Sequence, residues 1–379
     1  MTRLAQMGYP VVYLAFVGHY RHKARPMNGP LPGTPNLSVY TMPFAADVRK
    51  WRGVRRWLAG LRMARILSKN RIRKPVFWFY HPSLYSVAYS HDDAAIVYDV
   101  MDHFPSFEHS IDDAYFDELA LLAEADVVFT GGNSLQRHAE QMIEFLLHDD
   151  DERGRETGEP LPQLSHRSPI CLPSGVDLQH YSRALQLSGH AQRQHQPPTG
   201  GFCYGYFGAI DERIDWEILR YLAAQHPADR VTLAGPVLGA LPNDLPPNIE
   251  LVGPVPYDEL PLTVSTFDVC MIPFKNTPLV QFVSPTKTPE YLAAGKPVVS
   301  TGIPDVVHDY GDVVRVADTP EDFTRGCVEA AQNPPPPDAL AREAGTRARS
   351  WDDIAQVMAH EMSAAIAKNE RATGSEFQQ

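Results

Sequence analysis

The stretch SPTKTPEYLAAGKPVVST, residues 284–301, decides the fold of the second half of this 379-residue chain. Glu290 starts a short run of helix formers, Gly295 supplies the left-handed residue that ends a helix, and the β-branched residues after Pro297 predict a strand. A loop that leads into a helix directs free N–H groups and partial positive charge outward, and Lys287 adds a full charge. This combination suits a diphosphate, whereas the Glu290 carboxylate suits the paired hydroxyls of a ribose. The alternative is an ordinary α/β unit whose charged side chains are solvated.

The same stretch resembles the donor-binding segment of GT-B glycosyltransferases in the glycosyltransferase family 4 group. The resemblance is to a bacterial subset that reads S-P-x-K-x-x-E-Y-L-A-A-G-K-P-V-V. Four other segments resemble the family in the same order: LPSGVDLQHY (172–181), YFGAIDERIDWEIL (206–219), NIELVGPVPYDELP (248–261) and FDVCMIPF (267–274). The resemblance runs from about residue 97 to residue 351. It implies an α/β protein of the GT-B fold, with two Rossmann-like domains that face each other across a cleft.

The pattern of apolar runs agrees with that fold class. Short apolar runs alternate with helical patterns, which predicts parallel sheets with crossover helices. The expected strands are residues 11–16, 75–80, 95–100 and 126–130 in the first half, and 202–207, 230–234, 249–252, 269–273 and 297–301 in the second.

The predicted domain organisation has four parts. Residues 1–182 form an acceptor-side domain, residues 183–200 a polar linker, and residues 201–349 the nucleotide-sugar domain. A helix in residues 350–379 follows, and the resemblance implies that it crosses back to the first domain. The charged insert at residues 148–166 is predicted to be an exposed loop.

The first residues depart from the family pattern. Residues 2–7 are predicted to be helical before the strand at 11–16, whereas a GT-B first domain opens with a strand and a Gly-rich turn. We therefore expect either that the true start lies upstream or that part of the acceptor site is lost. The alternative is an intact domain that begins with a helix.

Composition excludes several classes of protein. The net charge of −12 argues against nonspecific nucleic-acid binding. No run of about 18 apolar residues is present, which is the usual minimum for a membrane-spanning helix. The cysteines lack C-x-x-C spacing and predict reduced core thiols: Cys171, Cys203, Cys270 and Cys327. These features predict a cytoplasmic enzyme.

One segment reverses the acidic balance. Between Arg49 and Lys74 the chain has many basic residues and no acidic ones, and apolar residues recur at helical spacing. Such a basic amphipathic helix, centred on Arg49 to Arg65, can dock on an anionic membrane at the inner face of the cell membrane. The alternative is a surface helix that packs its apolar stripe on a sheet. The stripe consists of Trp51, Val54, Leu58 and Leu61.

The resemblance assigns the donor-binding residues. It implies that Ser284, Thr286, Lys287 and the turn at Gly208 and Ala209 serve the diphosphate, with Arg213 as a second cation and Glu290 on the ribose. It also implies that the turn at Val255 and Pro256 meets the nucleobase. Arg213 could instead be a helix-surface arginine, and Val255 and Pro256 a plain turn.

Two polar residues follow the strand at residues 95–100. Asp102 and His103 lie just beyond its carboxyl end, where ligands of open α/β sheets bind. The resemblance implies that they contact the transferred sugar. The alternatives are a helix N-cap for Asp102 and an exposed imidazole for His103. Gly131, Gly132 and Ser134 resemble the next loop of the family, or else a capped helix start.

One departure concerns the sugar-holding carboxylates. The family often has two glutamates seven residues apart; Glu290 fits the second, but Phe282 occupies the first position. No D-x-D motif is evident at a strand end, so metal-independent chemistry without a cofactor is expected, with UDP- or GDP-linked sugar as substrate. The Glu290-type helix implies retention of the anomeric configuration.

Three functions remain open from the sequence. The first is a glycosyltransferase that acts on a cell-surface polysaccharide or a lipid-linked acceptor, as expected for cell envelope biosynthesis. The second is a GT-B nucleotide-sugar epimerase, which needs no acceptor. The third is a catalytically inactive nucleotide-binding module. The sequence does not identify the sugar, the base or the acceptor.

Overall fold

The structure is a computed structural model that describes residues 1–17, 28–43, 52–82, 94–106, 112–157, 168–188 and 201–376. The chain divides into two compact units. One comprises residues 1–98, 124–127 and 352–379, and the other residues 99–123 and 128–351. The domain boundaries expected from the sequence stay predictions.

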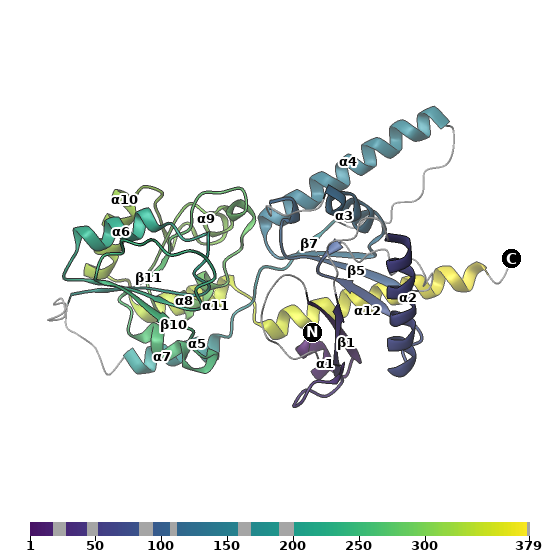
Figure 1. Cartoon of the computed structure of the whole chain (residues 1–379), viewed down its shortest axis with the longest axis horizontal. Helices are drawn as coiled ribbons and strands as arrows, with labels where there is room; N and C mark the ends of the chain where they lie inside the picture. The colour runs from purple at the N-terminus through teal and green to yellow at the C-terminus, as the bar shows by residue number, and fades with distance from the viewer. Residues whose placement is uncertain are drawn as a thin grey trace. The chain divides into compact units, whose positions relative to one another are not determined.

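A six-stranded parallel sheet forms the centre of the second half of the chain (Figure 1). Its strands lie in the order β10-β9-β8-β11-β12-β13, so the strand order reverses between β8 and β11. This is the doubly wound order, and ligands bind such sheets beyond the carboxyl ends of the strands at the reversal. The strands are β8 (Cys203–Phe207), β9 (Arg230–Ala234), β10 (Ile249–Gly253), β11 (Val269–Ile272), β12 (Val298–Ser300) and β13 (Arg315–Val316).

Helices cover both faces of this sheet (Figure 1). On one face α6 (Trp216–Gln225) contacts α10 (Pro320–Gln332). On the other, α5 (Leu178–Ser188) contacts α7 (Leu260–Ser265), α8 (Lys287–Ala293) and α11 (Pro337–Arg347). The remaining elements are α9 (Pro304–Tyr310) and the 3₁₀ turns η5 (Tyr257–Glu259) and η6 (Val280–Phe282).

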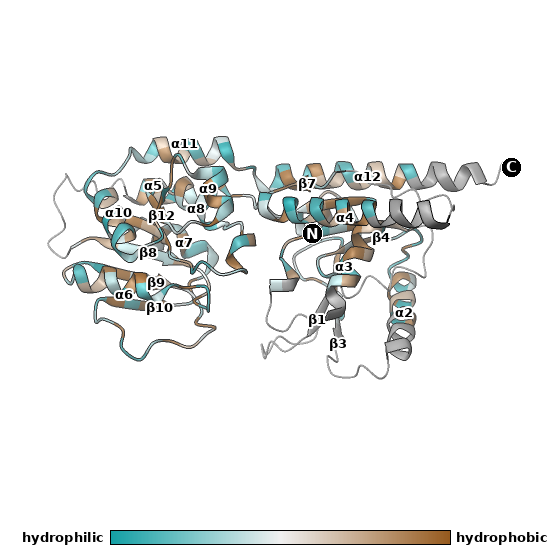
Figure 2. Cartoon of the chain, turned by 90° about the horizontal axis from the view of Figure 1, so that it is seen from above, coloured by the Kyte–Doolittle hydropathy of each residue, from teal (hydrophilic) through white to brown (hydrophobic). Residues whose placement is uncertain are grey.

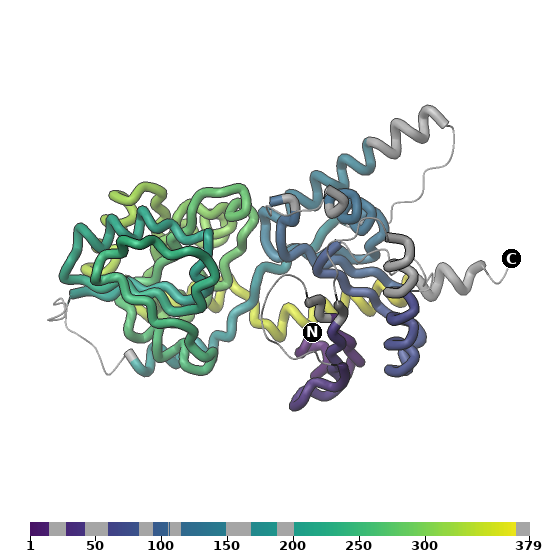
Figure 3. Tube along the Cα trace, in the orientation of Figure 1, coloured from purple at the N-terminus to yellow at the C-terminus, as the bar shows by residue number. Residues whose placement is uncertain are grey.

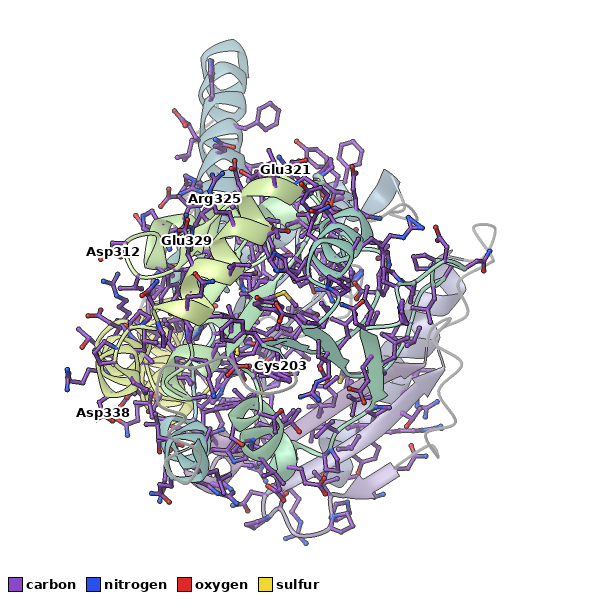
Figure 4. All side chains as sticks on the ribbon, turned by 90° about the vertical axis from the view of Figure 1, so that its left-hand side faces the viewer. Cys203, Asp312, Glu321, Arg325, Glu329 and Asp338 are labelled. Atoms are coloured by element: carbon purple, nitrogen blue, oxygen red, sulfur yellow. The ribbon has the colours of Figure 1, made fainter. Side chains whose placement is uncertain are left out.

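The apolar strands of this sheet pack into a continuous core with the helices. Tyr204, Leu222, Met271 and Phe323 have no exposed surface. Charged residues lie outside it: Figure 4 shows Arg325 and Glu329 on the outer side of α10, where they pair with Asp322 and Arg315. The amphipathic pattern of the helices therefore explains the layered arrangement.

The first half of the chain contains two further sheets among the described residues. One has the order β4-β5-β6-β7, with strands Val76–Phe79, Ala95–Val100, Val127–Thr130 and Ile170–Cys171. The other has the order β1-β3-β2, with strands Val11–Val17, Leu37–Pro43 and Asn28–Pro30, and β2 runs antiparallel to β3. The sequence patterns predicted neither β2 nor β3. Their helices are α1 (Thr2–Gln6), α2 (Arg52–Lys69), α3 (Asp112–Glu124) and α4 (Asn133–Thr157), with the 3₁₀ turn η3 (Phe104–Ser106).

Three helices are longer than the sequence predicts. Helix α8 begins at Lys287, so this lysine lies in the first turn of the helix and not in the preceding loop. Helix α4 continues to Thr157, so residues 148–157 of the expected loop are helical, and residues 158–167 lie outside the described part. Helix α5 continues to Ser188, which makes the first residues of the expected linker helical. In α4 and α5 the polar composition that predicted a loop belongs to the end of a helix.

The last helix, α12 (Trp351–Glu376), belongs to the same unit as the N-terminal residues. Arg3 Nε donates to the Asp352 carboxylate at 2.6 Å, and the Tyr9 and Ser363 hydroxyls lie 3.4 Å apart. Figure 3 shows the N-terminal segment beside α12. Hydrophilic and hydrophobic positions alternate along α11 and α12 (Figure 2), as expected for helices with one face on a protein core.

Helix α2 uses part of its apolar surface to pack on the β1-β3-β2 sheet. Ile66 and Tyr40 are buried against each other, and Arg62 donates to the Thr41 carbonyl at 2.9 Å. Met63 and Leu67 are also buried, whereas Leu61, the member of the predicted stripe whose side chain is described, is 44% exposed. Arg49 and Trp51 lie outside the described residues. None of the helices, over their described residues, is both long and apolar enough to cross a bilayer.

All four cysteines are free thiols. Cys203, Cys270 and Cys327 are buried in the core around the six-stranded sheet, and Cys171 is half-buried in β7. Figure 4 shows Cys203 inside the layers of its domain. Burial raises the pKa of Cys171 to about 11 and raises those of Cys270 and Cys327 further. Cys270 and Cys327 are therefore unreactive core residues.

Candidate functional site

Two glycines at adjacent strand ends create the turn after β8. Gly208 and Gly235 follow β8 and β9 with φ values of +140° and +156°. A Cβ on Gly235 would overlap the carbonyl oxygen of Gly208, and a Cβ on Gly208 would overlap the side chain of Lys287. Only glycine fits both positions. The Tyr206 hydroxyl donates to the Ala209 carbonyl at 2.9 Å and fixes the turn.

Lys287 lies over this turn. Its side-chain amine is 5.6 Å from the centre of the Tyr206 ring, directly above Gly208. Burial lowers the pKa of Lys287, the nearby carboxylate of Glu290 raises it, and the charge of Arg213 lowers it. An anion placed between Lys287 and Arg213 would relieve the repulsion between these two cations. The N-cap residue Thr286 makes no side-chain capping bond, so its hydroxyl is not used by the helix end.

Arg213 is held in place by Asp211. Its guanidinium donates twice to the Asp211 carboxylate, at 2.9 Å from Nε and 2.6 Å from Nη2, and lies 5.3 Å from the centre of the Phe274 ring. Burial raises the pKa of Asp211, but the hydrogen bonds and charge of Arg213 outweigh it and leave that pKa lowered. Arg213 is therefore a fixed, half-buried cation and not a free arginine on a helix surface.

Glu290 lies one turn beyond Lys287 in α8. Burial raises its pKa to about 7, while Lys287 and the hydroxyl of Tyr181 act in the opposite direction. Tyr181 is buried, with its ring parallel to Phe207 at 6.0 Å. The neighbouring ring of Tyr257 is stacked on His180 at 4.1 Å. Near neutral pH the carboxyl group of Glu290 is thus divided between its charged and neutral forms.

The predicted nucleobase turn lies beside this aromatic group. Gly253 ends β10 with φ +82°, and Val255 packs partly on the core. Pro256 is exposed and precedes Tyr257, which is 51% exposed although its ring rests on His180. The backbone of this turn is therefore anchored by the packed side chains of Val255 and Tyr257.

The loop after β5 carries the predicted sugar-side residues. Loss of water raises the pKa of Asp102, and the charge of Arg213 lowers it. The structure therefore brings Asp102 within electrostatic reach of Arg213. His103 lies 2.5 Å from the Ser106 hydroxyl through Nδ1, and its ring is stacked on Phe282 at 3.8 Å. His103 is thus not an isolated exposed imidazole.

The loop after β6 meets the segment that precedes α8. Asp305 accepts a hydrogen bond from the Ser134 backbone N–H at 2.8 Å, at the start of α4. A Cβ on Gly132 would overlap Asp305 and crowd Ser284, so the glycine permits this contact. Ser284 therefore lies against Gly132. Gly131 donates to the Val100 carbonyl at 2.9 Å and lies next to Met101, which places this loop beside that of Asp102.

Several residues of the site were not predicted from sequence. Asp211, Gly235 and Tyr181 support Arg213, Gly208 and Glu290, and His138 and Ser106 contact His103. The repetition of an apolar strand followed by glycine, YFG and LAG, was a signal for Gly235. The others are brought together only by the fold. Within the described residues, no group of three or more His, Cys, Asp and Glu side chains has the arrangement of a metal site.

Comparisons with known proteins agree with this geometry. Residues 207–333 match the family described as "Glycosyl transferases group 1". TuaH of Bacillus subtilis (strain 168), named as a teichuronic acid biosynthesis glycosyltransferase, is 29% identical over 168 residues, which are 41% of this chain. The match spans 40% of the length of TuaH.

The fold is similar to those of solved glycosyltransferases. Sucrose-phosphate synthase from Thermosynechococcus elongatus superposes with a TM-score of 0.68 at 13% identity, covering 97% of this chain and 92% of that one. HepE of Anabaena, solved with UDP and glucose, gives 0.58 at 14% identity, covering 86% of each chain. These structures confirm the predicted α/β GT-B fold. Residues 207–333 of this chain are therefore similar to the group 1 glycosyltransferases, and the chain has a GT-B fold.

Proposed function

We propose that this protein transfers a sugar from a UDP- or GDP-linked donor to a cell-surface polysaccharide or a lipid-linked acceptor. The observation that carries the proposal is the position of Lys287 over the Gly208 turn, with Arg213 nearby, at the point where the strand order reverses. Two cations beside a glycine turn suit a diphosphate. The likeness to TuaH, which is named for teichuronic acid biosynthesis, supports a glycan acceptor.

The proposed mechanism assigns one task to each group. Breaking the anomeric bond builds negative charge on the departing diphosphate, and Lys287 and Arg213 stabilise that charge. Ser284 and Thr286 add hydroxyl donors, Glu290 accepts hydrogen bonds from the ribose, and the turn at Val255 and Pro256 meets the base. Asp102 and His103 hold the transferred sugar. The charge is balanced by side chains, so the reaction is metal-independent; it retains configuration and involves no covalent enzyme nucleophile.

A membrane role for α2 is part of this proposal. The buried side chains of α2 account for one face only, and Arg65 and Lys69 are exposed together with Leu61. An exposed face of this composition suits the surface of an anionic bilayer. Docking there would bring the protein to a lipid-linked acceptor at the inner face of the cell membrane.

A screen with a panel of nucleotide sugars tests the proposal. Nucleotide release is measured with and without a lipid extract, in the presence of EDTA. Release that requires the extract and survives EDTA is the expected result. Isomerised nucleotide sugar without acceptor would favour the epimerase instead, and nucleotide binding with no turnover of any donor would favour an inactive binding module.

A further inference from the structure

Three rings from distant parts of the sequence pack together beside Asp102. His103 and Phe282 lie parallel, 3.8 Å apart with an interplanar angle of 9°. His138 of α4 meets His103 edge-on at 4.4 Å and Phe282 at 5.7 Å. Offset and edge-to-face arrangements of this kind stabilise an aromatic pair beyond the area that it buries. The arrangement therefore restrains the plane of the His103 ring.

A hydrogen bond fixes the remaining freedom of His103. Its Nδ1 atom is 2.5 Å from the Ser106 hydroxyl, one turn further along η3. This contact sets the rotation of the imidazole within the plane that Phe282 defines. Nε2 is then the nitrogen that Ser106 does not engage, and it is held in one direction.

Phe282 is not needed to anchor its own turn. Val280, in the same 3₁₀ turn, is buried in the core and attaches η6 to the domain. Phe282 is only partly buried and does not belong to that core cluster. Its ring instead covers one face of His103, which excludes water from that face.

Resting on the proposed sugar transfer, we propose that Phe282 is a positioning residue that keeps His103 uncharged and directs its Nε2 atom to a hydroxyl group of the donor sugar. A neutral imidazole can serve as donor or acceptor to a hydroxyl, whereas an imidazolium can only donate. Among the described residues, His138 on α4 faces the His103 ring, and Asp102 precedes His103 in the chain.

The protonation state of His103 agrees with this role. Burial, with a smaller contribution from His138, lowers the pKa of His103 to about 4. The group is therefore neutral throughout the physiological range. Replacing Phe282 by leucine would admit water to the ring face and move the pKa back toward its ordinary value of about 6.5. A glutamate at the same place would raise it further, because a carboxylate favours the charged imidazole.

Imidazole titration by NMR in the full chain tests the proposal independently of activity. Histidine-selective ¹⁵N labelling is combined with His103→Gln and His138→Gln variants to assign the signals. We expect His103 to titrate below pH 5 in the parent protein and in Phe282→Tyr, which keeps the stack. In Phe282→Leu its pKa should rise by about one unit or more, and in Phe282→Glu by more than that. Parent-like titration in both Phe282→Leu and Phe282→Glu would overturn the proposal.

Kinetics separate this inference from the proposed function. With the donor found in the screen, Phe282→Leu should lower kcat about tenfold or more and leave nucleotide affinity unchanged. The acidic limb of its pH profile should move upward by the shift seen by NMR. If no donor turns over while the NMR shifts appear, sugar transfer fails and the restraint of His103 stands. If a donor turns over but Phe282→Leu keeps the parent kcat and pH profile, the positioning role fails alone.

Discussion

Lys287 and Arg213 carry like charges close together; burial lowers the pKa of Lys287, and the charge of Arg213 lowers it further. A structure that places two cations close together gains stability when an anion binds between them. Asp211 is hydrogen-bonded to Arg213, and the carboxylate nearer to Lys287 is that of Glu290, whose own pKa burial raises to about 7. The single-residue energetics of the site thus favour a ligand with negative charge.

Replacement of Lys287 tests whether the site binds a negatively charged ligand. Lys287→Ala should weaken binding of UDP and GDP sugars by about 1.5–3 kcal/mol, the scale of a charge-assisted hydrogen bond. Glu290→Gln should weaken binding through the ribose. Calorimetric titration measures both, with the exposed Lys368→Ala as control. Unchanged affinity in both site variants would remove the donor assignment.

Removal of the Tyr181 hydroxyl tests the state of Glu290. The Tyr181 hydroxyl lowers the pKa of Glu290, so Tyr181→Phe should raise that pKa above about 7. If the charged form binds the ribose, nucleotide affinity at pH 7 falls and recovers as the pH rises past the new value. Calorimetry from pH 6 to about 9 measures this shift. Tyr204→Phe is the matched control, because its buried hydroxyl donates to Asp229 instead; an identical profile in both variants would refute the coupling.

At the scale of elements, the candidate site lies at the carboxyl ends of the strands. The turns after β8, β9 and β10 all use glycines with positive φ: Gly208, Gly235 and Gly253. The first two are also closely packed, whereas a Cβ on Gly253 would meet nothing within 4 Å. Positive φ and close packing are therefore separable in this one sheet.

Alanine substitutions measure that difference. Gly253→Ala should lower the free energy of unfolding by about 1–2 kcal/mol through its backbone conformation alone. Gly235→Ala should cost a further ~1–3 kcal/mol, because its Cβ would overlap backbone that cannot rotate away. Urea denaturation compares the two. Equal losses would mean that the β8 and β9 ends are not packed as described.

The outward face of α2 can be tested with vesicles. Each basic residue near an anionic bilayer contributes about 1 kcal/mol, and the attraction falls with salt. We expect sedimentation with anionic but not neutral liposomes, and a loss of binding in Arg65→Glu with Lys69→Glu. Arg342→Glu, at a basic residue on α11, is a charge-matched control. Equal recovery in both supernatants would leave α2 with its packing role only.

Element types were more predictable than their ends or their partners. β5 and β9 have the predicted bounds because their apolar runs are bordered by charged or turn residues. Gly295 follows α8 with φ +68°, the left-handed conformation that was predicted to end this helix. β2 consists of Asn, Gly and Pro, which carry no strand signal, whereas β3 (LSVYTMP) contains β-branched and aromatic residues that do carry one, so β3 was overlooked although its signal is present. The contacts of His103 with His138 and Phe282 depend on residues far apart in the chain, and no local pattern encodes such contacts.

For the whole molecule, the candidate site combines loops from both halves of the sequence. Asp102 follows β5 and lies within electrostatic reach of Arg213, which follows β8. Asp305 accepts a hydrogen bond from the backbone N–H of Ser134 at the start of α4, and these two residues are also far apart in the sequence. The site therefore includes residues outside the segment 207–333 that matches the group 1 family.

Asp102→Asn tests the contribution of the first half. The substitution should leave nucleotide binding nearly intact and lower the transfer rate, the pattern expected for an interaction made mainly in the transition state. Nucleotide affinity and kcat are measured on the same preparation. A loss of affinity with unchanged kcat would place Asp102 in nucleotide binding instead.

The buried cysteine thiols can be used to measure local opening of the domain around the six-stranded sheet. Cys203, Cys270 and Cys327 lie on β8, β11 and α10, and burial keeps Cys270 and Cys327 protonated. An alkylating reagent can reach them only when the surrounding layers separate, since the thiolate is the reactive form. The labelling rate of each thiol therefore reports how often the structure around that residue opens. A bound nucleotide should slow that labelling without any engineered probe.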